Sequence, residues 1–168
     1  MFSLSAVAWL VVGAAHLAAS YPFEVPVSAC VDMMPKGPGH NDVAAQNSKI
    51  PYDFSLERVT IRSSDSVEFT IRQKAGGPTF AAFMVQARSG NSPTPLGTFQ
   101  PKGDNARTVT CSADNDTGSH NSPDPKKSVT LIWTPPTNFK GNVNFYVTVA
   151  ENKLKFWVRH KAAALSVK

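Results

Sequence analysis

The residues best suited to bind a metal ion lie close together in one polar stretch. Asp114, Asp116, His120 and Asp124 all fall between Ala113 and Lys127. Carboxylate oxygens are the ligands that Ca²⁺ prefers, but the stretch lacks the spacing and the closing glutamate of an EF-hand loop. Zinc would require more thiols or a paired histidine spacing. The sequence therefore predicts no metal site.

Catalytic side chains are also present, without the spacing of a known catalytic motif. His40, His120 and His160 are the histidines that follow the apolar N-terminal segment. The chain has no Gly-x-Ser-x-Gly elbow, no His-Glu-x-x-His motif and no glycine loop that would bind phosphate. A triad is recognised by its geometry, and ordinary surface placement explains these scattered histidines. We expect no enzyme and no cofactor.

The same polar stretch contains a site for covalent modification. Asn115-Asp116-Thr117 matches the acceptor sequence for N-linked glycosylation. Residues 113–127 are rich in turn-forming residues and have no apolar period, which predicts an exposed loop. A glycan on Asn115 would hinder tight coordination of a metal in this loop.

Basic residues suggest a third kind of chemistry, the binding of anionic polymers. The chain has 17 Lys and Arg against 12 Asp and Glu, which gives a formal charge of +5. Ammonium and guanidinium groups pair with phosphate. Alternatively, these are solvated charges that keep sheet edges of different molecules apart. No run of five basic residues occurs, so nucleic acid is not expected as a partner. The candidate contact residues are Arg88, Lys126, Lys127, Lys153, Lys155, Arg159 and Lys161.

The N-terminal segment predicts export from the cell. Residues 1–20 contain an apolar run that ends at Ala18-Ala19-Ser20, and small residues at these positions are typical of a signal-peptide cleavage site. A membrane anchor is the alternative, but the run is short for a span. We therefore expect a signal peptide at 1–20, a single domain at 21–168, and no span in the mature chain.

Two cysteines, Cys30 and Cys111, remain in the expected mature chain. In the oxidising environment outside the cell, an isolated pair is expected to form a disulfide. Such a bridge would hold the irregular N-terminal arm, residues 21–55, which is rich in proline.

The remaining sequence has the period of two that is typical of half-buried strands. Val143, Phe145, Val147 and Val149 alternate with polar residues, and the apolar run at 79–88 predicts a central strand covered on both faces. Trp157 is expected in the core. The predicted strands are 57–62, 66–73, 79–88, 96–100, 106–112, 128–134, 142–150 and 155–161. About eight strands without a long helix predict an all-β, antiparallel immunoglobulin-like or fibronectin-like sandwich.

Several short sequence segments of this chain resemble those of a known family. The chain resembles the reeler domain of reelin and F-spondin, and more closely the secreted insect defence proteins of the noduler type. It departs from the family pattern at Ala81-Ala82 and at Ser119-His120. The phrases that carry the resemblance are Cys30 with Met34-Pro35 and His40, Phe80 to Arg88, Leu96 to Phe99, Cys111, Val129 to Trp133, Pro135-Pro136, Gly141, Val143, Phe145 and Val149.

The resemblance implies a function that the residues alone do not. It implies a sandwich with a Cys30–Cys111 bridge, secretion into haemolymph, and binding of lipopolysaccharide, lipoteichoic acid and β-glucan. It also implies binding to the haemocyte surface and promotion of nodulation. The alternative is an extracellular adhesion module that binds a host cell-surface or matrix protein. In either case we expect a monomer.

Overall fold

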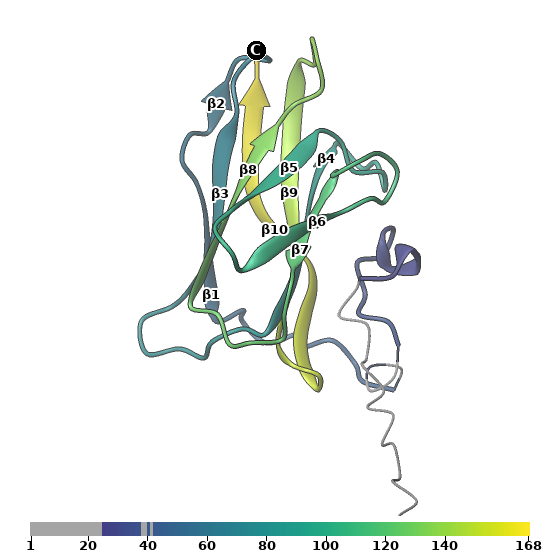
Figure 1. Ribbon diagram of the computed structural model, residues 1–168, viewed down its shortest axis with the longest axis vertical. Coiled ribbons are helices and arrows are strands. Elements are labelled where there is room, and N and C mark those ends of the chain that lie inside the picture. Colours follow the sequence, from purple (N-terminus) through teal and green to yellow (C-terminus); the bar gives the residue numbers. More distant parts are fainter. Residues whose placement is uncertain (1–24, 38–39, 41) are drawn as a thin grey trace, which may run out of the picture.

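The protein is a two-layered β-sandwich (Figure 1). The computed structural model describes residues 25–37, 40 and 42–168. Among these residues it has one short 3-10 helix and ten strands. They are η1 (Val27–Ala29), β1 (Tyr52–Leu56), β2 (Thr60–Ile61), β3 (Val67–Gln73), β4 (Ala82–Ser89), β5 (Thr98–Lys102), β6 (Ala106–Val109), β7 (Thr117–His120), β8 (Ser128–Thr134), β9 (Gly141–Asn152) and β10 (Lys155–Val167).

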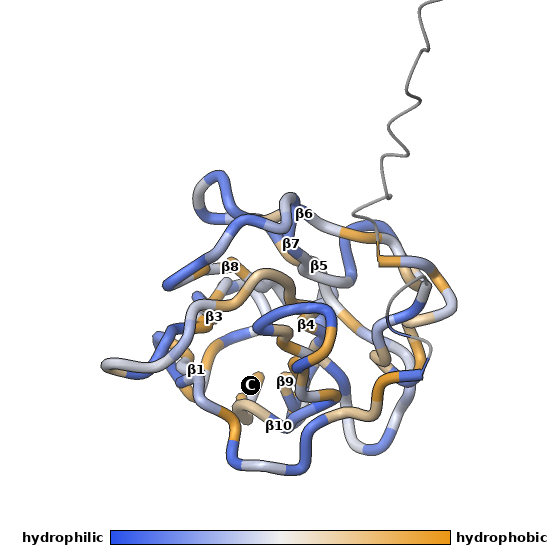
Figure 2. Tube along the Cα trace, turned by 90° about the horizontal axis from the view of Figure 1, so that it is seen from below, coloured by the Kyte–Doolittle hydropathy of each residue, from blue (hydrophilic) through white to orange (hydrophobic). Residues whose placement is uncertain are grey.

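The strands form two sheets that pack face to face. One sheet has the order β1-β3-β8-β5 and the other has the order β2-β10-β9-β4-β7-β6. Figure 2 looks along the sandwich from below and shows the two sheets as separate layers. The expected all-β sandwich is therefore confirmed. Its pairing is antiparallel except between β2 and β10, which run parallel.

Alternating side chains from both sheets fill the core. Phe69 of β3 stacks on Phe145 of β9 with ring centroids 5.2 Å apart, and Trp133 of β8 meets Phe145 edge to face at 5.5 Å. Each aromatic pair adds about 1 kcal/mol beyond the burial of its area. The indole Nε1 of Trp133 donates to the Leu96 carbonyl at 3.0 Å. Gly97 must be glycine, since its φ is +73° and a Cβ would lie 2.6 Å from that nitrogen.

Strand β4 is covered on both faces, as its apolar run predicted. Phe83, Val85 and Ala87 point into the core between the sheets. Met84 lies on the opposite face, in a second cluster with Met33 and Cys30 from the N-terminal arm. The disulfide between Cys30 and Cys111 holds the arm over this face, as the cysteine count indicated. The described part of the arm around Cys30 and Met33 is therefore packed against the second sheet.

The two edges of the sandwich differ. At one edge, the Phe99 amide of β5 donates to the Asn115 carbonyl at 2.7 Å, which ties β5 to the turn before β7. At the other edge, the chain leaves the first sheet at the end of β1 and enters the second as β2. Since β2 covers only the last residues of β10, the sandwich stays open between β1 and the earlier part of β10.

Three sequence predictions about the elements are wrong. Residues 57–62 are not one strand, and Val59 is exposed. Residues 52–56, expected in the irregular arm, form β1, whose Tyr52 lies in the core. Residues 113–127 are not an exposed loop throughout, because β7 lies within them and pairs with both β4 and β6. The buried Trp157 confirms the expectation that it is a core residue.

Two further expectations concern the predicted signal peptide and membrane spans. The predicted signal peptide at 1–20 lies outside the described residues. In the described part of the chain, no helix is long and apolar enough to cross a bilayer.

Candidate functional site

Arg88 is not the outward-pointing contact residue that the sequence suggested. Its side chain is 3 % exposed, since the arm covers this face of β4. Its guanidinium donates to the carbonyls of Cys30 at 2.9 Å and Val31 at 3.0 Å, and lies 5.8 Å from the Tyr146 ring centroid. Burial lowers the pKa of Arg88, and the charge of Arg159 lowers it further. Arg88 therefore holds the N-terminal arm against β4.

Lys126 is also buried, which corrects its assignment as a surface cation. Its Nζ donates to the carbonyls of Ser122 at 2.7 Å, Asp124 at 2.8 Å and Ala81 at 3.1 Å. Three acceptors match the three N–H groups of an ammonium. Burial lowers the pKa of Lys126, while the Asp124 charge opposes this shift. Lys126 stabilises the loop before β8.

The other five candidate cations are exposed, and four of them lie on one hairpin. Lys153 is in the β9–β10 turn, whereas Lys155, Arg159 and Lys161 are on β10. Lys127 lies apart, next to the start of β8. Lys155 pairs with Glu151 at 2.9 Å, which partly neutralises it. The structure therefore brings together four of the seven predicted polymer-binding residues.

Asp116, one of the residues considered for calcium, has a structural role. The Asp116 carboxylate accepts hydrogen bonds from the amides of Cys111, Ser112 and Ala113 at 2.7–2.9 Å. Burial would raise the pKa of Asp116, but these hydrogen bonds outweigh it and the pKa is lowered. Among the residues that the structure describes, no three His, Cys, Asp or Glu side chains form a metal-binding group. Asn115 beside it is exposed on the turn.

His120 is a core histidine at the end of β7. Its Nδ1 lies 3.1 Å from the Phe83 carbonyl oxygen and 3.3 Å from the Ser119 hydroxyl. Burial lowers the pKa of His120, and the charges of Lys126 and Arg107 lower it further, against the opposing effect of the Phe83 carbonyl. The imidazole therefore binds a proton less readily in the folded protein than in the unfolded chain.

This histidine makes stability depend on pH. The unfolded chain binds a proton at His120 near pH 6.5, while the folded chain does so only at a lower pH. Stability is therefore expected to fall as the pH drops below 6.5, because the unfolded state then binds more protons. Melting temperatures measured from pH 8 to pH 5 test this. His120→Gln should make the melting temperature depend less on pH below 6.5, and the control His160→Gln should not. Equal pH dependence of the melting temperature in the two variants would contradict this role of His120.

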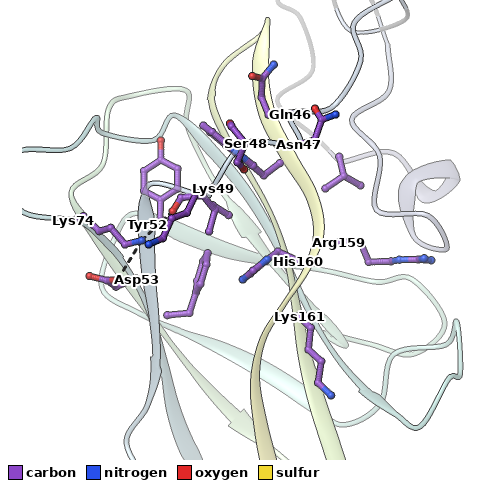
Figure 3. Close-up of a pocket in the computed structure, with 14 residues that line it drawn as sticks. Gln46, Asn47, Ser48, Lys49, Tyr52, Asp53, Lys74, Arg159, His160 and Lys161 are labelled. Atoms are coloured by element: carbon purple, nitrogen blue, oxygen red, sulfur yellow. Dashed lines mark hydrogen bonds and ion pairs between the residues drawn. The ribbon is translucent and has the colours of Figure 1, made fainter.

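The open edge between β1 and β10 forms a cleft of about 680 Å³ (Figure 3). One wall is the segment that leads into β1, and the other is the first half of β10. The closed end is held by two hydrogen bonds, from the Gln46 amide to the Phe156 carbonyl at 2.8 Å and from the Trp157 indole to the Ser48 carbonyl at 3.0 Å. The lining residues are Gln46 to Ile50, Tyr52 to Phe54, Lys74 and Trp157 to Lys161.

Charged groups lie at the rim of this cleft. Lys74 lies 3.8 Å from Asp53 and also donates to the Ile50 carbonyl at 3.0 Å. Lys49 is exposed on the same wall. Arg159 lines the opposite wall at its base but points away from β1 (Figure 3). On the wall opposite β10, Lys49 and Lys74 outnumber Asp53, so this wall carries net positive charge.

His160 is the ring that faces the cleft from β10. It points toward β1 in Figure 3, and its centroid lies 5.4 Å from that of Phe54. Sequence reasoning did not select Lys49, Asp53 or Lys74, because residues up to 55 were expected to be irregular. The alternation of Tyr52, Phe54 and Leu56 was the signal that could have placed β1, and with it this wall.

Comparison with known proteins identifies the family. The family model of the Reeler domain matches residues 28–168. This chain belongs to the Reeler family. The chain is 31% identical over 164 residues to "Putative defense protein 1" of Antheraea mylitta, covering 94% of this chain and 93% of that protein. It is 35% identical over 156 residues to "Defense protein l(2)34Fc" of Drosophila melanogaster, covering 89% and 92%.

A solved structure supports the fold, and a relative that matches only in part limits which functions can be inferred from similarity. The human F-spondin reeler domain superposes with a TM-score of 0.62 at 13% identity, over 76% of this chain and 96% of that one. "Putative ferric-chelate reductase 1" of Danio rerio is 32% identical over 151 residues, which cover 89% of this chain but 26% of that protein. The Reeler domain thus corresponds to about a quarter of the reductase.

Proposed function

We propose that this Reeler protein is a secreted defence protein that binds microbial surface polymers, such as lipopolysaccharide, lipoteichoic acid and β-glucan, and promotes haemocyte nodulation. Relatives named as defence proteins match this chain over nearly the full length of both. The disulfide fits a protein that works outside the cell, in haemolymph. Asn115, exposed on its turn, remains the proposed site for a glycan, and a monomer remains the proposed state.

The observation that carries this proposal is the cationic hairpin beside an open cleft. Strand β10 presents Arg159 and Lys161 to solvent, and the exposed Lys49 lies on the facing wall. Guanidinium and ammonium groups bind phosphate through charge-assisted hydrogen bonds. A polymer with repeated anionic groups can engage several of these residues at once, which raises the avidity above that of a single contact.

Binding without cleavage is the activity that the cleft supports. Hydrolysis of a glycosidic bond ordinarily needs two carboxyl groups on opposite sides of the bond. Of the residues that line the cleft, Asp53 alone carries a carboxylate. We therefore propose a recognition protein and not a hydrolase.

Polymer binding at physiological salt tests the proposed function. The double variant Arg159→Gln with Lys161→Gln is expected to bind lipoteichoic acid about thirtyfold more weakly, since each of the two cations near an anionic surface contributes about 1 kcal/mol. Arg72→Gln with Lys168→Gln removes the same charge elsewhere on the surface and is the matched control. Affinity is measured by isothermal titration at two salt concentrations. No saturable binding to any of the three polymers would refute the function, and binding insensitive to salt would refute the cationic mechanism.

An adhesion module that binds a host surface or matrix protein is the second candidate. Val27 and Val31 are 65% and 61% exposed on the arm, four residues apart. Apolar side chains on an ordered surface segment favour contact with a protein more than with an anionic polymer. A pull-down from haemolymph that recovers one stoichiometric protein, together with an absence of polymer binding, would favour this function.

A further inference from the structure

We propose that the cleft between β1 and β10 is a saccharide-binding site that holds one or two pyranose units of a larger glycan. This inference rests on the proposed function, because it names the part of the polymer that enters the cleft. The anionic groups of the same polymer would then lie outside the cleft, on the exposed face of β10 where Arg159 and Lys161 are found.

The size and shape of the cleft fit such a ligand. Its volume is about 680 Å³. Sites for small organic ligands usually measure about 300–1,000 Å³. The cleft is open toward solvent along the sandwich edge, since β2 pairs with β10 only at Ser166 and Val167. A sugar unit can therefore enter while the rest of the chain continues across the surface.

The floor of the cleft is apolar, aromatic and held in place before any ligand arrives. Tyr52 and Trp157 meet edge to face with centroids 5.9 Å apart. Burial raises the pKa of Tyr52 to about 12, so its hydroxyl stays protonated and donates to the Thr79 carbonyl at 3.1 Å. Phe54 and His160 form the adjoining ring pair. Tyr52 and Trp157 are themselves buried, so the exposed His160 ring and the half-buried Phe54 ring offer the surface for the C–H face of a pyranose, without the entropic cost of ordering them.

The rim supplies both hydrogen-bond donors and acceptors. Gln46 and Asn47 carry amide groups, Ser48 carries a hydroxyl and Asp53 a carboxylate, all along one wall. Within the part of the chain that the structure describes, the side chains of Gln46, Asn47 and Ser48 make no hydrogen bond. Amide groups can donate and accept at once, which matches the dual character of sugar hydroxyls.

The same set of groups disfavours a free anion as the ligand in the cleft. Lys74 is already paired with Asp53, and the Asp53 carboxylate would repel a phosphate placed beside it. Arg159 points away from the cleft in Figure 3. A neutral ring with hydroxyl groups satisfies the amides and the carboxylate together, whereas the negative charge of a phosphate is repelled by that carboxylate.

Nuclear magnetic resonance of the full-length mature protein tests this site with three probes: laminaritriose, the disaccharide of N-acetylglucosamine, and inorganic phosphate. We expect at least one saccharide to shift the Trp157 indole signal and the amide signals of residues 46–54. Phosphate should leave these unchanged and shift the signals near Arg159 and Lys161. If neither saccharide shifts the cleft signals, or if phosphate alone does, the assignment is wrong.

Substitutions at the rim separate this inference from the proposed function. Asn47→Ala and Asp53→Asn are each expected to weaken saccharide binding roughly fivefold, because each removes hydrogen bonds to the ligand. Asn105→Ala, an exposed asparagine in the β5–β6 turn, is the matched control and should bind as the native protein does. Polymer binding that is unchanged in both rim variants would overturn the saccharide site alone. Loss of all polymer binding in the native protein would instead overturn the proposed function.

Discussion

Replacing Cys30 and Cys111 together with alanine is expected to lower the free energy of unfolding by about 4 kcal/mol. The bridge closes a loop with a sequence separation of 81, so its loss restores a large conformational entropy to the unfolded chain. It also releases the arm, whose Met33 is packed against Met84. Urea unfolding followed by tryptophan fluorescence measures the change.

Reduction provides the control for the cysteine variant. Dithiothreitol should lower the stability of the native protein to that of the Cys30→Ala, Cys111→Ala variant, and should leave the variant unchanged. The Met33 amide, which donates to the Ala29 carbonyl, should exchange faster with solvent in both cases. An unfolding midpoint that reduction does not move would show that the bridge contributes nothing to stability.

Arg88→Met is expected to lower the free energy of unfolding by about 3 kcal/mol. The substitution removes the guanidinium donors of the Cys30 and Val31 carbonyls, and a buried group left unpaired costs about 1–3 kcal/mol. The Cys30 carbonyl keeps a hydrogen bond from the Gln86 Nε2 at 3.1 Å, so the loss falls mainly on Val31. Gln86, whose Oε1 accepts from the Arg88 Nε at 2.9 Å, loses a partner as well. Thermal and urea unfolding of the variant measure the cost.

The exposed Arg72 of β3 gives the matched control for this substitution. Arg72→Met removes the same charge, and its expected effect on stability is within about 0.5 kcal/mol. Below its melting temperature, the Arg88→Met variant should bind polymer as the native protein does, because Arg88 does not reach the surface. If the Arg88→Met variant had native stability but bound polymer more weakly, Arg88 would be a polymer-contact residue, as the sequence suggested.

The fold could be predicted where burial follows a regular period. Strands β3, β8 and β9 alternate between core and surface, and their residues showed this in the sequence. Strand β7 could not be found in this way. Its Thr-Gly-Ser-His sequence has no apolar side chain, and its burial comes from pairing with β4 and β6 on its two sides. Hydrogen bonding between strands that are distant in sequence, and not hydropathy, determines that element.

The candidate site could be predicted only in part. The basic residues of the β9–β10 hairpin are close in sequence, so their grouping required only that this segment form a hairpin. The facing wall comes from residues 46–54 and Lys74, about a hundred positions away in the chain. Residue type alone also misplaced Arg88 and Lys126, since their burial depends on the arm and on a loop that covers them.

The sequence by itself determined the β-sandwich, the cysteine bridge, the buried central strand and the family resemblance. Each of these follows from the order of residues along one segment or from the presence of a single pair of cysteines. Only the tertiary structure decided which cations reach solvent and where a ligand can bind. Exposure depends on what packs above a side chain. The cleft exists because the chain changes sheets between β1 and β2, so that no strand pairs with the first half of β10 at the edge opposite β9.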